Sequence, residues 1–347
     1  MLMLLVAILV FGAVIFVHEL GHFAIAKWSG IKVNEFAIGM GPRLLKFQKG
    51  ETVYALRLLP IGGFVSMEGE DEESFDERSY TSAPVRKRFM VIIAGAFMNL
   101  VLGFAAMLLL VACSEGDLLV SRTIATFYPE ASTQDTGLAV GDTIVEVNGR
   151  YCFVIDDVFY EFARTQDATV DLTVLRDGEK IELQNVVFAT EEYMDEQTGE
   201  SHLLMVVDFK VLGVPKGFFS VMKESFLKTV SCVRLIYLSL LDLVTGNVAV
   251  NQLSGPVGIV NEIGKAASIG WRPVVNMLAM ISVNLGVMNM LPLPALDGSK
   301  ALLLIVEGIR RKPINHNLEI GISIAGFALL MCLMVFVSFN DIRKIFF

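Results

Sequence analysis

Four long apolar segments dominate the pattern of hydrophobic and polar positions along the chain. The first begins at Leu2 and carries no charge before His18. Each of the others is uncharged for at least 20 residues, which is long enough to cross a hydrocarbon core of about 30 Å. We therefore expect a polytopic α-helical membrane protein, with transmembrane helices over 1–28, 89–113, 274–308 and 318–341.

The composition agrees with several membrane spans. Hydrophobic residues make up 54% of the 347 positions, and the mean hydropathy of +0.60 is too high for a soluble enzyme. The net charge of -9 gives no support to nucleic-acid binding. The N-terminus has no basic n-region and no small-residue cleavage site, so we expect it to be retained as a span. No C-x-x-C pair occurs, and we expect four free thiols. These are Cys113, Cys152, Cys232 and Cys332.

Three ionisable side chains interrupt the first apolar segment within five positions. The stretch His18-Glu19-Leu20-Gly21-His22 matches H-E-x-x-H. On a helix, residues four apart share one face, so both imidazoles can bind one zinc ion while Glu19 acts as general base. The alternative is a pair of interfacial histidines at a helix end. We favour the metal site, because ionisable groups inside a span usually mark function.

Basic residues set the expected orientation. The segment from Lys27 to Arg88 holds ten of the 28 Lys and Arg residues, and the short link 309–317 is also basic. The positive-inside rule places both segments in the cytoplasm. We therefore expect a multi-pass protein of the cell membrane. Both termini and the region 114–273 would then be extracytoplasmic.

Helix rise predicts that Asp297 reaches a depth similar to that of His18. His18 lies about 24 Å into the first span, near the cytoplasmic side, and Asp297 lies at most about 35 Å into the third. Pro292 and Pro294 should unwind the helix just before Asp297. A carboxylate at that depth on broken backbone is a suitable third zinc ligand. The alternative is that Asp297 merely pairs with Lys300.

The cytoplasmic region 29–88 carries strand and turn signals. The segments Arg43–Phe47, Thr52–Leu58 and Phe64–Glu68 are rich in β-formers and are separated by glycine-containing turns. We expect a membrane-associated β-hairpin region. Its edge can pair with an unwound substrate by β-augmentation, and the alternative is a small packing hairpin.

Region 115–212 has the composition of a soluble α/β module. A hairpin is predicted where Thr169–Leu175 meets Ile181–Val187. The next segment, 216–245, has helical periodicity with charges along one face. We therefore expect amphipathic membrane-surface helices within 214–273 and not a fifth span.

Together these motifs resemble those of the site-2 protease family of intramembrane zinc metalloproteases, bacterial RseP/RasP type. That family has His-Glu-x-x-His in its first span and a Leu-Asp-Gly motif in a later one, here Leu296-Asp297-Gly298. Ser299 and Ala96 depart from the family pattern, which usually has glycine and proline there. Four further stretches match in the family's order, over nearly the whole chain. They are Gly39-Met40-Gly41-Pro42, Pro60-Ile61-Gly62-Gly63-Phe64-Val65, Ala94-Gly95 followed by Asn99, and the loop Ser254-Gly255-Pro256-Val257-Gly258-Ile259.

The resemblance implies a Zn2+ endopeptidase ligated by His18, His22 and Asp297, with Glu19 as the catalytic base. It also implies that an extracytoplasmic PDZ domain at 114–213, in a single copy, is inserted into the four-helix membrane part. The residues expected near substrate are Asn284, Asn289, Gly62, Gly63 and Phe64. For the two asparagines, hydrogen bonding between helices is the alternative.

The expected substrates are single-span membrane proteins already shortened outside, such as anti-sigma factors, or remnant signal peptides. The PDZ domain would act as a size filter. The first alternative is a zinc transporter, which needs more spans and a second ligand-rich helix, whereas the second span supplies only Asn99. The other is a non-proteolytic PDZ membrane scaffold. Glu19 argues against it, because zinc retention alone does not require that acid.

Overall fold

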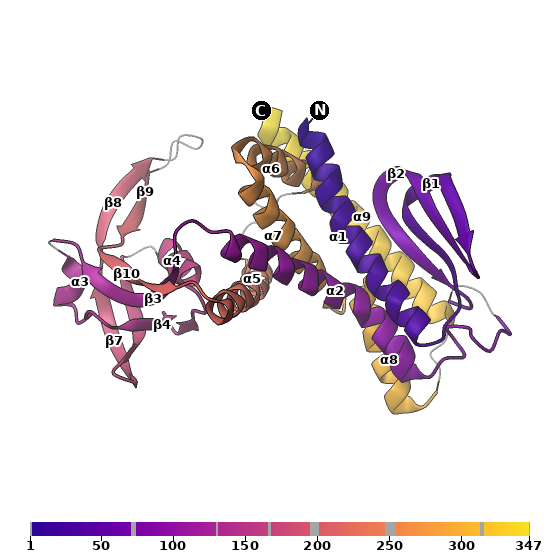
Figure 1. Cartoon of the computed structure of the whole chain (residues 1–347), viewed down its shortest axis with the longest axis horizontal. Coiled ribbons are helices and arrows are strands. Elements are labelled where there is room, and N and C mark those ends of the chain that lie inside the picture. Colours follow the sequence, from indigo (N-terminus) through magenta and orange to yellow (C-terminus); the bar gives the residue numbers. More distant parts are fainter. Residues whose placement is uncertain are drawn as a thin grey trace. The chain divides into compact units, whose positions relative to one another are not determined.

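The computed structural model describes residues 2–70, 74–129, 131–165, 168–194, 201–246, 255–312 and 316–346. The chain divides into two compact units. One comprises Met1–Leu110 together with Cys232–Phe347, and the other comprises Val111–Ser231. The first unit holds the long apolar helices, and the second is built mainly of β-strands (Figure 1).

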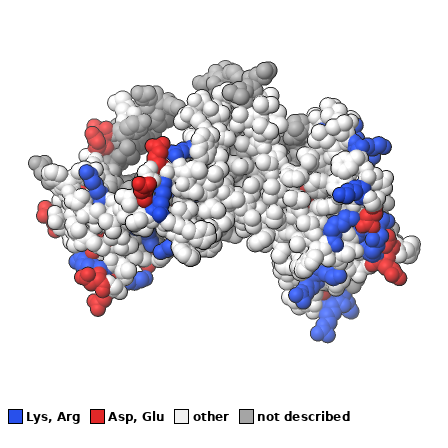
Figure 2. All heavy atoms as spheres, viewed as in Figure 1, with Lys and Arg blue, Asp and Glu red and all other residues white. Residues whose placement is uncertain are grey.

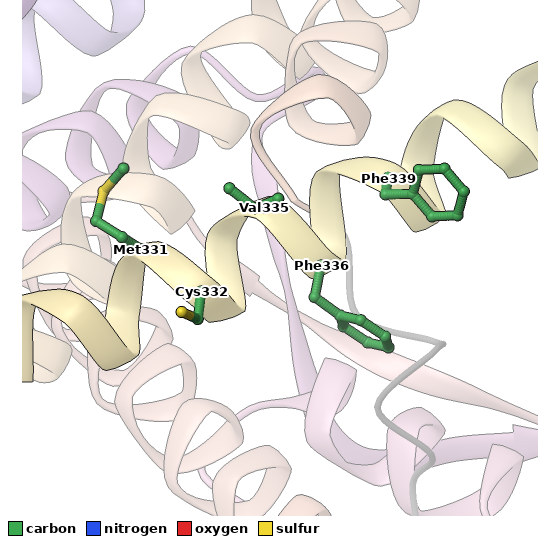
Figure 3. A pocket seen from close by; sticks show the side chains of 5 residues that line it. All are labelled: Met331, Cys332, Val335, Phe336 and Phe339. Atoms are coloured by element: carbon green, nitrogen blue, oxygen red, sulfur yellow. The ribbon is translucent and has the colours of Figure 1, made fainter.

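Within the described residues, four helices are long and apolar enough to cross a membrane, as the sequence predicts. The expectation of free cysteines is also confirmed. Half or more of the residues in the apolar stretch of each of these helices are not buried within the structure. An open hollow along the last helix is lined only by apolar residues (Figure 3). Such a surface suits a hydrocarbon environment. The helices are α1 (Leu2–Trp28), α2 (Val85–Ala112), α7 (Trp271–Met290) and α9 (His316–Phe346).

The third expected span is broken into two helices. Helix α7 ends at Met290 and α8 (Asp297–Arg310) begins after six intervening residues, Leu291–Leu296, which are not helical. Pro292 and Pro294 lack the backbone N–H that a continuous helix needs, and their rings clash with the preceding turn. The break places Asp297 at the start of a helix, facing the rest of the bundle.

The segment before the third span corrects our expectation of a loop at 254–259. Helix α6 (Pro256–Ile269) begins at Pro256, because proline at the first helical position has a preset φ and needs no N–H partner. The carboxylate of Asp341 in α9 accepts hydrogen bonds from the backbone N–H groups of Gly255 and Gly258, at 3.1 and 2.8 Å. A carboxylate there stabilises a helix N-terminus. Ser254 lies outside the described residues.

The helices of the first unit have one basic end. Lys87 at the start of α2 donates to the carbonyl oxygen of Ser29, just after α1, at 2.8 Å. Arg88 pairs with Glu307, near the end of α8, at 2.5 Å. The end of α1, the start of α2 and the end of α8 therefore lie together. Figure 2 shows Lys and Arg side chains gathered at this end, beside a band of helices without charge.

The strands β1 (Val33–Lys49) and β2 (Thr52–Met67) form a sheet of their own, longer than the three short strands expected. The first part of β1 pairs on both sides, with residues 53–56 and with residues 63–66. Both strands bend for this, and Gly39 permits it at φ 85°. Residues 63–66 pair on one side only within the described register, so they form an edge of the sheet.

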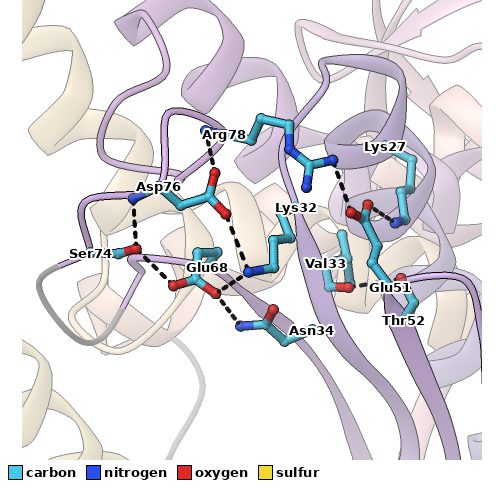
Figure 4. A network of polar contacts seen from close by, with 10 residues as sticks. All are labelled: Lys27, Lys32, Val33, Asn34, Glu51, Thr52, Glu68, Ser74, Asp76 and Arg78. Carbon is cyan, nitrogen blue, oxygen red and sulfur yellow. Dashed lines mark hydrogen bonds and ion pairs between the residues drawn. The ribbon is translucent and has the colours of Figure 1, made fainter.

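Aromatic and polar contacts fix this sheet to α1. The ring of Phe36 packs edge-on against Phe16 and Phe23, with centroids 6.0 and 5.2 Å apart. Lys27, at the end of α1, pairs with Glu51 at 2.6 Å (Figure 4). The acidic loop after β2 is also anchored, because Lys32 contacts Glu68 and Asp76 (Figure 4).

The second unit contains a six-stranded sheet with the order β10-β3-β4-β6-β7, in which β5 pairs with β4. Buried aliphatic and aromatic residues, mainly from the strands and from α4, form its core. Strands β8 (Ala189–Met194) and β9 (Ser201–Val206) make a separate ribbon. The predicted hairpin corresponds to β6 and β7. The remaining bounds are β3 (Leu118–Phe127), β4 (Thr143–Val147), β5 (Arg150–Tyr151), β6 (Thr169–Arg176), β7 (Glu179–Val187), β10 (Phe209–Pro215), α3 (Ser132–Asp135) and α4 (Ile155–Ala163).

Helix α5 (Phe218–Thr245) follows the sheet. It is not one of the four candidate spans found among the described residues. Exposed apolar side chains alternate along it with charged ones, including Lys223 and Lys228. The placement of this helix on the membrane surface stays a prediction from the sequence.

Two arginines surround a carboxylate in the β1–β2 sheet. Arg43 donates to Glu35 through two nitrogens, and Arg57 Nη2 donates to it at 2.7 Å. Burial raises the pKa of Glu35, but the hydrogen bonds and charges of the two arginines outweigh burial. The pKa of Glu35 therefore lies below its ordinary value, and the group is ionised at neutral pH.

We predict that Glu35→Gln lowers the free energy of unfolding by about 1–3 kcal/mol, because the two arginines lose a charged acceptor. A depressed folded-state pKa stabilises the fold above the unfolded pKa of about 4.3, and this stabilisation is lost as pH falls through the folded value. The difference in thermal midpoint in detergent, measured from pH 7 to pH 3, should therefore shrink with acid. Glu262→Gln, in an exposed pair with Lys265, is the control with little effect. A difference independent of pH would contradict this account.

Candidate metal centre

His18 and His22 lie one helical turn apart on α1, in a helix that is otherwise apolar over most of its length. Because residues four apart share a helix face, both rings project to the same side. Their Nε2 atoms are 3.2 Å apart. His18 is 8% exposed and is therefore buried.

Asp297, the first residue of α8, completes a group of three. Its Oδ2 atom is 3.2 Å from Nε2 of His18 and 3.3 Å from Nε2 of His22. Lys300, the alternative partner considered for Asp297, forms an ion pair with Glu70 at 3.1 Å. The structure thus brings together the three side chains that the sequence proposed as ligands.

The geometry of this group fits a metal ion. Its three ligand atoms form a triangle with sides of 3.2, 3.2 and 3.3 Å. A tetrahedral zinc site with ligand distances of about 2.0–2.2 Å separates neighbouring ligand atoms by about 3.3–3.6 Å. Among the described residues, Oδ2 of Asp297 is buried without a hydrogen-bond donor. An anionic oxygen in that position needs a cation, and the donor set of two imidazoles and one carboxylate suits zinc.

Helix α2 supports the two imidazoles from behind. The carbonyl oxygen of Val91 is 2.8 Å from Nδ1 of His22, and the amide of Asn99 is 3.2 Å from Nδ1 of His18. Between them lies Gly95, where a Cβ atom would be 2.8 Å from Cε1 of each ring. Sequence reasoning noted Gly95 and Asn99 only as motif positions. It missed Val91, because a backbone carbonyl leaves no signal in residue identity.

Glu19 lies half-buried between the ligand pair and the β1–β2 sheet. A Cβ atom on Gly63 would be 2.9 Å from Cγ of Glu19, so the edge segment of β2 passes directly against this side chain. No hydrogen bond or ion pair ties the Glu19 carboxylate to another of the described residues. A carboxylate in this state can take up a proton from a neighbouring molecule.

The residues expected near substrate divide into two groups. Gly63 reaches the site, and so does Asn289, which is buried with Nδ2 3.4 Å from Nε2 of His18. Asn284 is exposed on α7, and Gly62 lies against Met40. The guanidinium of Arg57 lies over the ring of Phe64, with Cζ 4.7 Å from the ring centre. No contact between these last three residues and the ligand group is found in the described part of the chain.

Comparison with known proteins agrees with this geometry. A model of peptidase family M50 matches residues 6–333. A protein of Clostridium acetobutylicum is 36% identical over 339 residues, covering 98% of this chain and 97% of the relative. The zinc metalloprotease RasP of Shouchella clausii is 31% identical over 423 residues, covering 99% of each chain. The regulator of sigma-W protease RasP of Bacillus subtilis is 28% identical over 420 residues, covering 98% of each.

Two glycine substitutions should separate metal binding from catalysis. Gly95→Ala presses a methyl group onto both imidazoles, so we expect metal affinity to fall about 10–100-fold. Gly63→Ala displaces Glu19 but leaves the ligand triangle untouched. We expect it to lower peptidase kcat/KM by about 100-fold with the metal content unchanged.

Gly12→Ala on α1 is the matched control for both variants, because nothing lies within 4 Å of its added Cβ. Metal content by mass spectrometry and peptide cleavage measure the two effects, and equal behaviour of Gly95→Ala and Gly12→Ala would refute the first.

Proposed function

The chain belongs to peptidase family M50 and is an intramembrane zinc protease, and from this premise we propose that it cleaves peptide bonds within the spans of single-span membrane proteins. The observation that carries the proposal is the ligand triangle of His18, His22 and Asp297 beside a carboxylate, Glu19, that no described residue engages. All four side chains belong to apolar helices or to their broken ends.

In this proposal His18, His22 and Asp297 hold the zinc ion. When bound, zinc supplies a Lewis acid that polarises the scissile carbonyl and makes water more acidic. Glu19 takes the proton of the attacking water and later delivers it to the leaving amine. Glu19 is suited to both steps, because the residue beside it on the hairpin, Gly63, adds no side chain between the carboxylate and a substrate.

The edge of the β1–β2 sheet is the proposed substrate platform. A helical substrate hides its carbonyl groups in hydrogen bonds within the helix and must unwind before hydrolysis. An extended segment can hydrogen-bond to the edge at residues 63–66, which would bring its backbone next to Glu19. Asn289 lies where its amide can contact the same segment, close to the ligand group.

We further propose the orientation and the role of the second unit. The basic end formed by α1, α2 and α8 would be cytoplasmic by the positive-inside rule. Both termini and the second unit, proposed to be a PDZ domain that limits substrate size, would be extracytoplasmic. A Bacillus subtilis relative is named as a regulator of sigma-W protease. This supports anti-sigma factors as a substrate class, and remnant signal peptides fit the same site.

The central test uses the purified protein and a synthetic single-span peptide. Glu19→Gln should retain zinc but lower cleavage by about 100–10,000-fold, because it removes the proton acceptor. Asp297→Asn should lose zinc and cleavage together. Glu262→Gln, an exposed acid distant in sequence from the site, should match the wild type. Cleavage at the wild-type rate by Glu19→Gln would refute the proposed mechanism.

The substrate platform has its own test. Successive N–H groups of a strand point to opposite edges, so N-methylation at alternate residues blocks one edge only. We expect one of two complementary N-methylated peptides to be cleaved about 30-fold more slowly, because about two hydrogen bonds are lost at about 1 kcal/mol each. The other peptide should be cleaved almost normally and serves as the control. Equal rates for the two peptides would rule out pairing at the sheet edge.

A further inference from the structure

Three positions of α2, each four residues apart, face the two histidines. Val91 and Asn99 contact the imidazoles, and Gly95 between them leaves room for both rings. A carbonyl oxygen only accepts hydrogen bonds, so the contact of Val91 with His22 requires a proton on Nδ1. The lone pair of His22 then lies on Nε2, the atom that belongs to the ligand triangle. The backbone of α2 therefore sets one of the two imidazoles in the tautomer that can bind a metal.

His18 needs the same tautomer, because its Nε2 atom, 3.2 Å from Oδ2 of Asp297, is also a corner of the ligand triangle. Only an acceptor at Nδ1 enforces it. Asn99 is fully buried and is the side chain that contacts Nδ1 of His18. Its nitrogen faces the ring, while its Oδ1 atom is buried with no hydrogen-bond partner among the described residues. The oxygen and the NH2 group of an amide occupy nearly the same volume, so the amide can be turned over in place. The oxygen then faces His18 and accepts a hydrogen bond from its Nδ1–H group.

Helix α7 holds the turn of α2 that carries Asn99. The hydroxyl of Ser282 donates to the backbone carbonyl oxygen of Asn99 at 2.7 Å, and Ser282 is itself fully buried. The close approach of the two helices continues at Gly286, where a Cβ atom would be 2.9 Å from the carbonyl oxygen of Ala96. Helix packing thus fixes the backbone of the residue that carries the amide.

We propose that Asn99 is a positioning residue that accepts a hydrogen bond from the Nδ1–H group of His18 and so keeps Nε2 of His18 available to zinc. This inference rests on the proposed zinc site and assigns a role in it to α2. A carboxylate or carbonyl behind a ligating histidine is worth about 10–100-fold in metal affinity. Asn99 supplies the acceptor for His18, as the Val91 carbonyl does for His22.

The test compares zinc affinity, by competition with a chelator, in variants of the full chain. Asn99→Leu keeps the volume but removes the acceptor, and should weaken zinc binding about 10–100-fold. Asn99→Asp keeps an acceptor and should stay within a few-fold of the wild type. Asn276→Leu, at an exposed asparagine of α7, is the matched control and should change nothing. Wild-type affinity in Asn99→Leu, or equal weakening in the leucine and aspartate variants, would overturn the assignment.

A second measurement needs no variant at the site. In the zinc-loaded wild type labelled with 15N-histidine, both ligating rings should show a proton on Nδ1 and none on Nε2. A proton on Nε2 of His18 would overturn the role of Asn99. Absence of zinc binding by the wild type would instead refute the proposed function, so the two failures are distinguishable.

Discussion

Two imidazoles and one carboxylate converge to within 3.3 Å of one another between helices that are apolar over most of their length. Ionisable groups are costly in such surroundings unless they are paired or bind a cation. The unsatisfied Oδ2 atom of Asp297 shows where the cation belongs. Metal binding is therefore coupled to the packing of α1 against α8, because the ligands come from opposite ends of the sequence. The break before α8, caused by Pro292 and Pro294, presents Asp297 at a helix start, which a continuous third span would not do.

The convergence requires the helix backbones to approach closely. Lipid gives apolar helices little reason to associate, so close packing through small residues and interhelical hydrogen bonds provides the attraction. Gly21 of α1 lies against the backbone of Ala94, Gly95 lies against both imidazoles, and Gly286 of α7 lies against the backbone of Ala96. These contacts place α2 directly behind the ligands. The same helix thus packs the bundle and orients the site.

A helical substrate must unwind before hydrolysis, and its freed backbone groups then need other hydrogen-bond partners. The β1–β2 sheet is attached to α1 by aromatic packing around Phe36 and by the ion pair of Lys27 with Glu51. Its edge therefore has a fixed position relative to Glu19. Gly63 allows the closest approach of this edge to the acid. Glu19 and the sheet edge that is proposed to bind substrate are thus both attached to one helix, α1.

Local sequence determined the parts of this protein that depend on spacing along one segment. Uninterrupted apolar length predicts the four spans, a separation of four residues places His18 and His22 on one face, and Pro292 with Pro294 predicts the helix break. Helix rise even placed Asp297 near the depth of His18. These properties need no knowledge of neighbouring segments, because they follow from backbone geometry.

Only the tertiary structure decided which segments touch. The glycine- and proline-containing stretch 254–259 was expected to be a loop, but Asp341 of α9 caps it and it is helical from Pro256. The strands of the β1–β2 sheet extend beyond their local β-signals because β1 finds partners on both sides. The carbonyl of Val91 and the amide of Asn99 gain their roles from the approach of α2 to α1. Such contacts join residues about 70–80 positions apart, and a sequence pattern read within one segment carries no information about them.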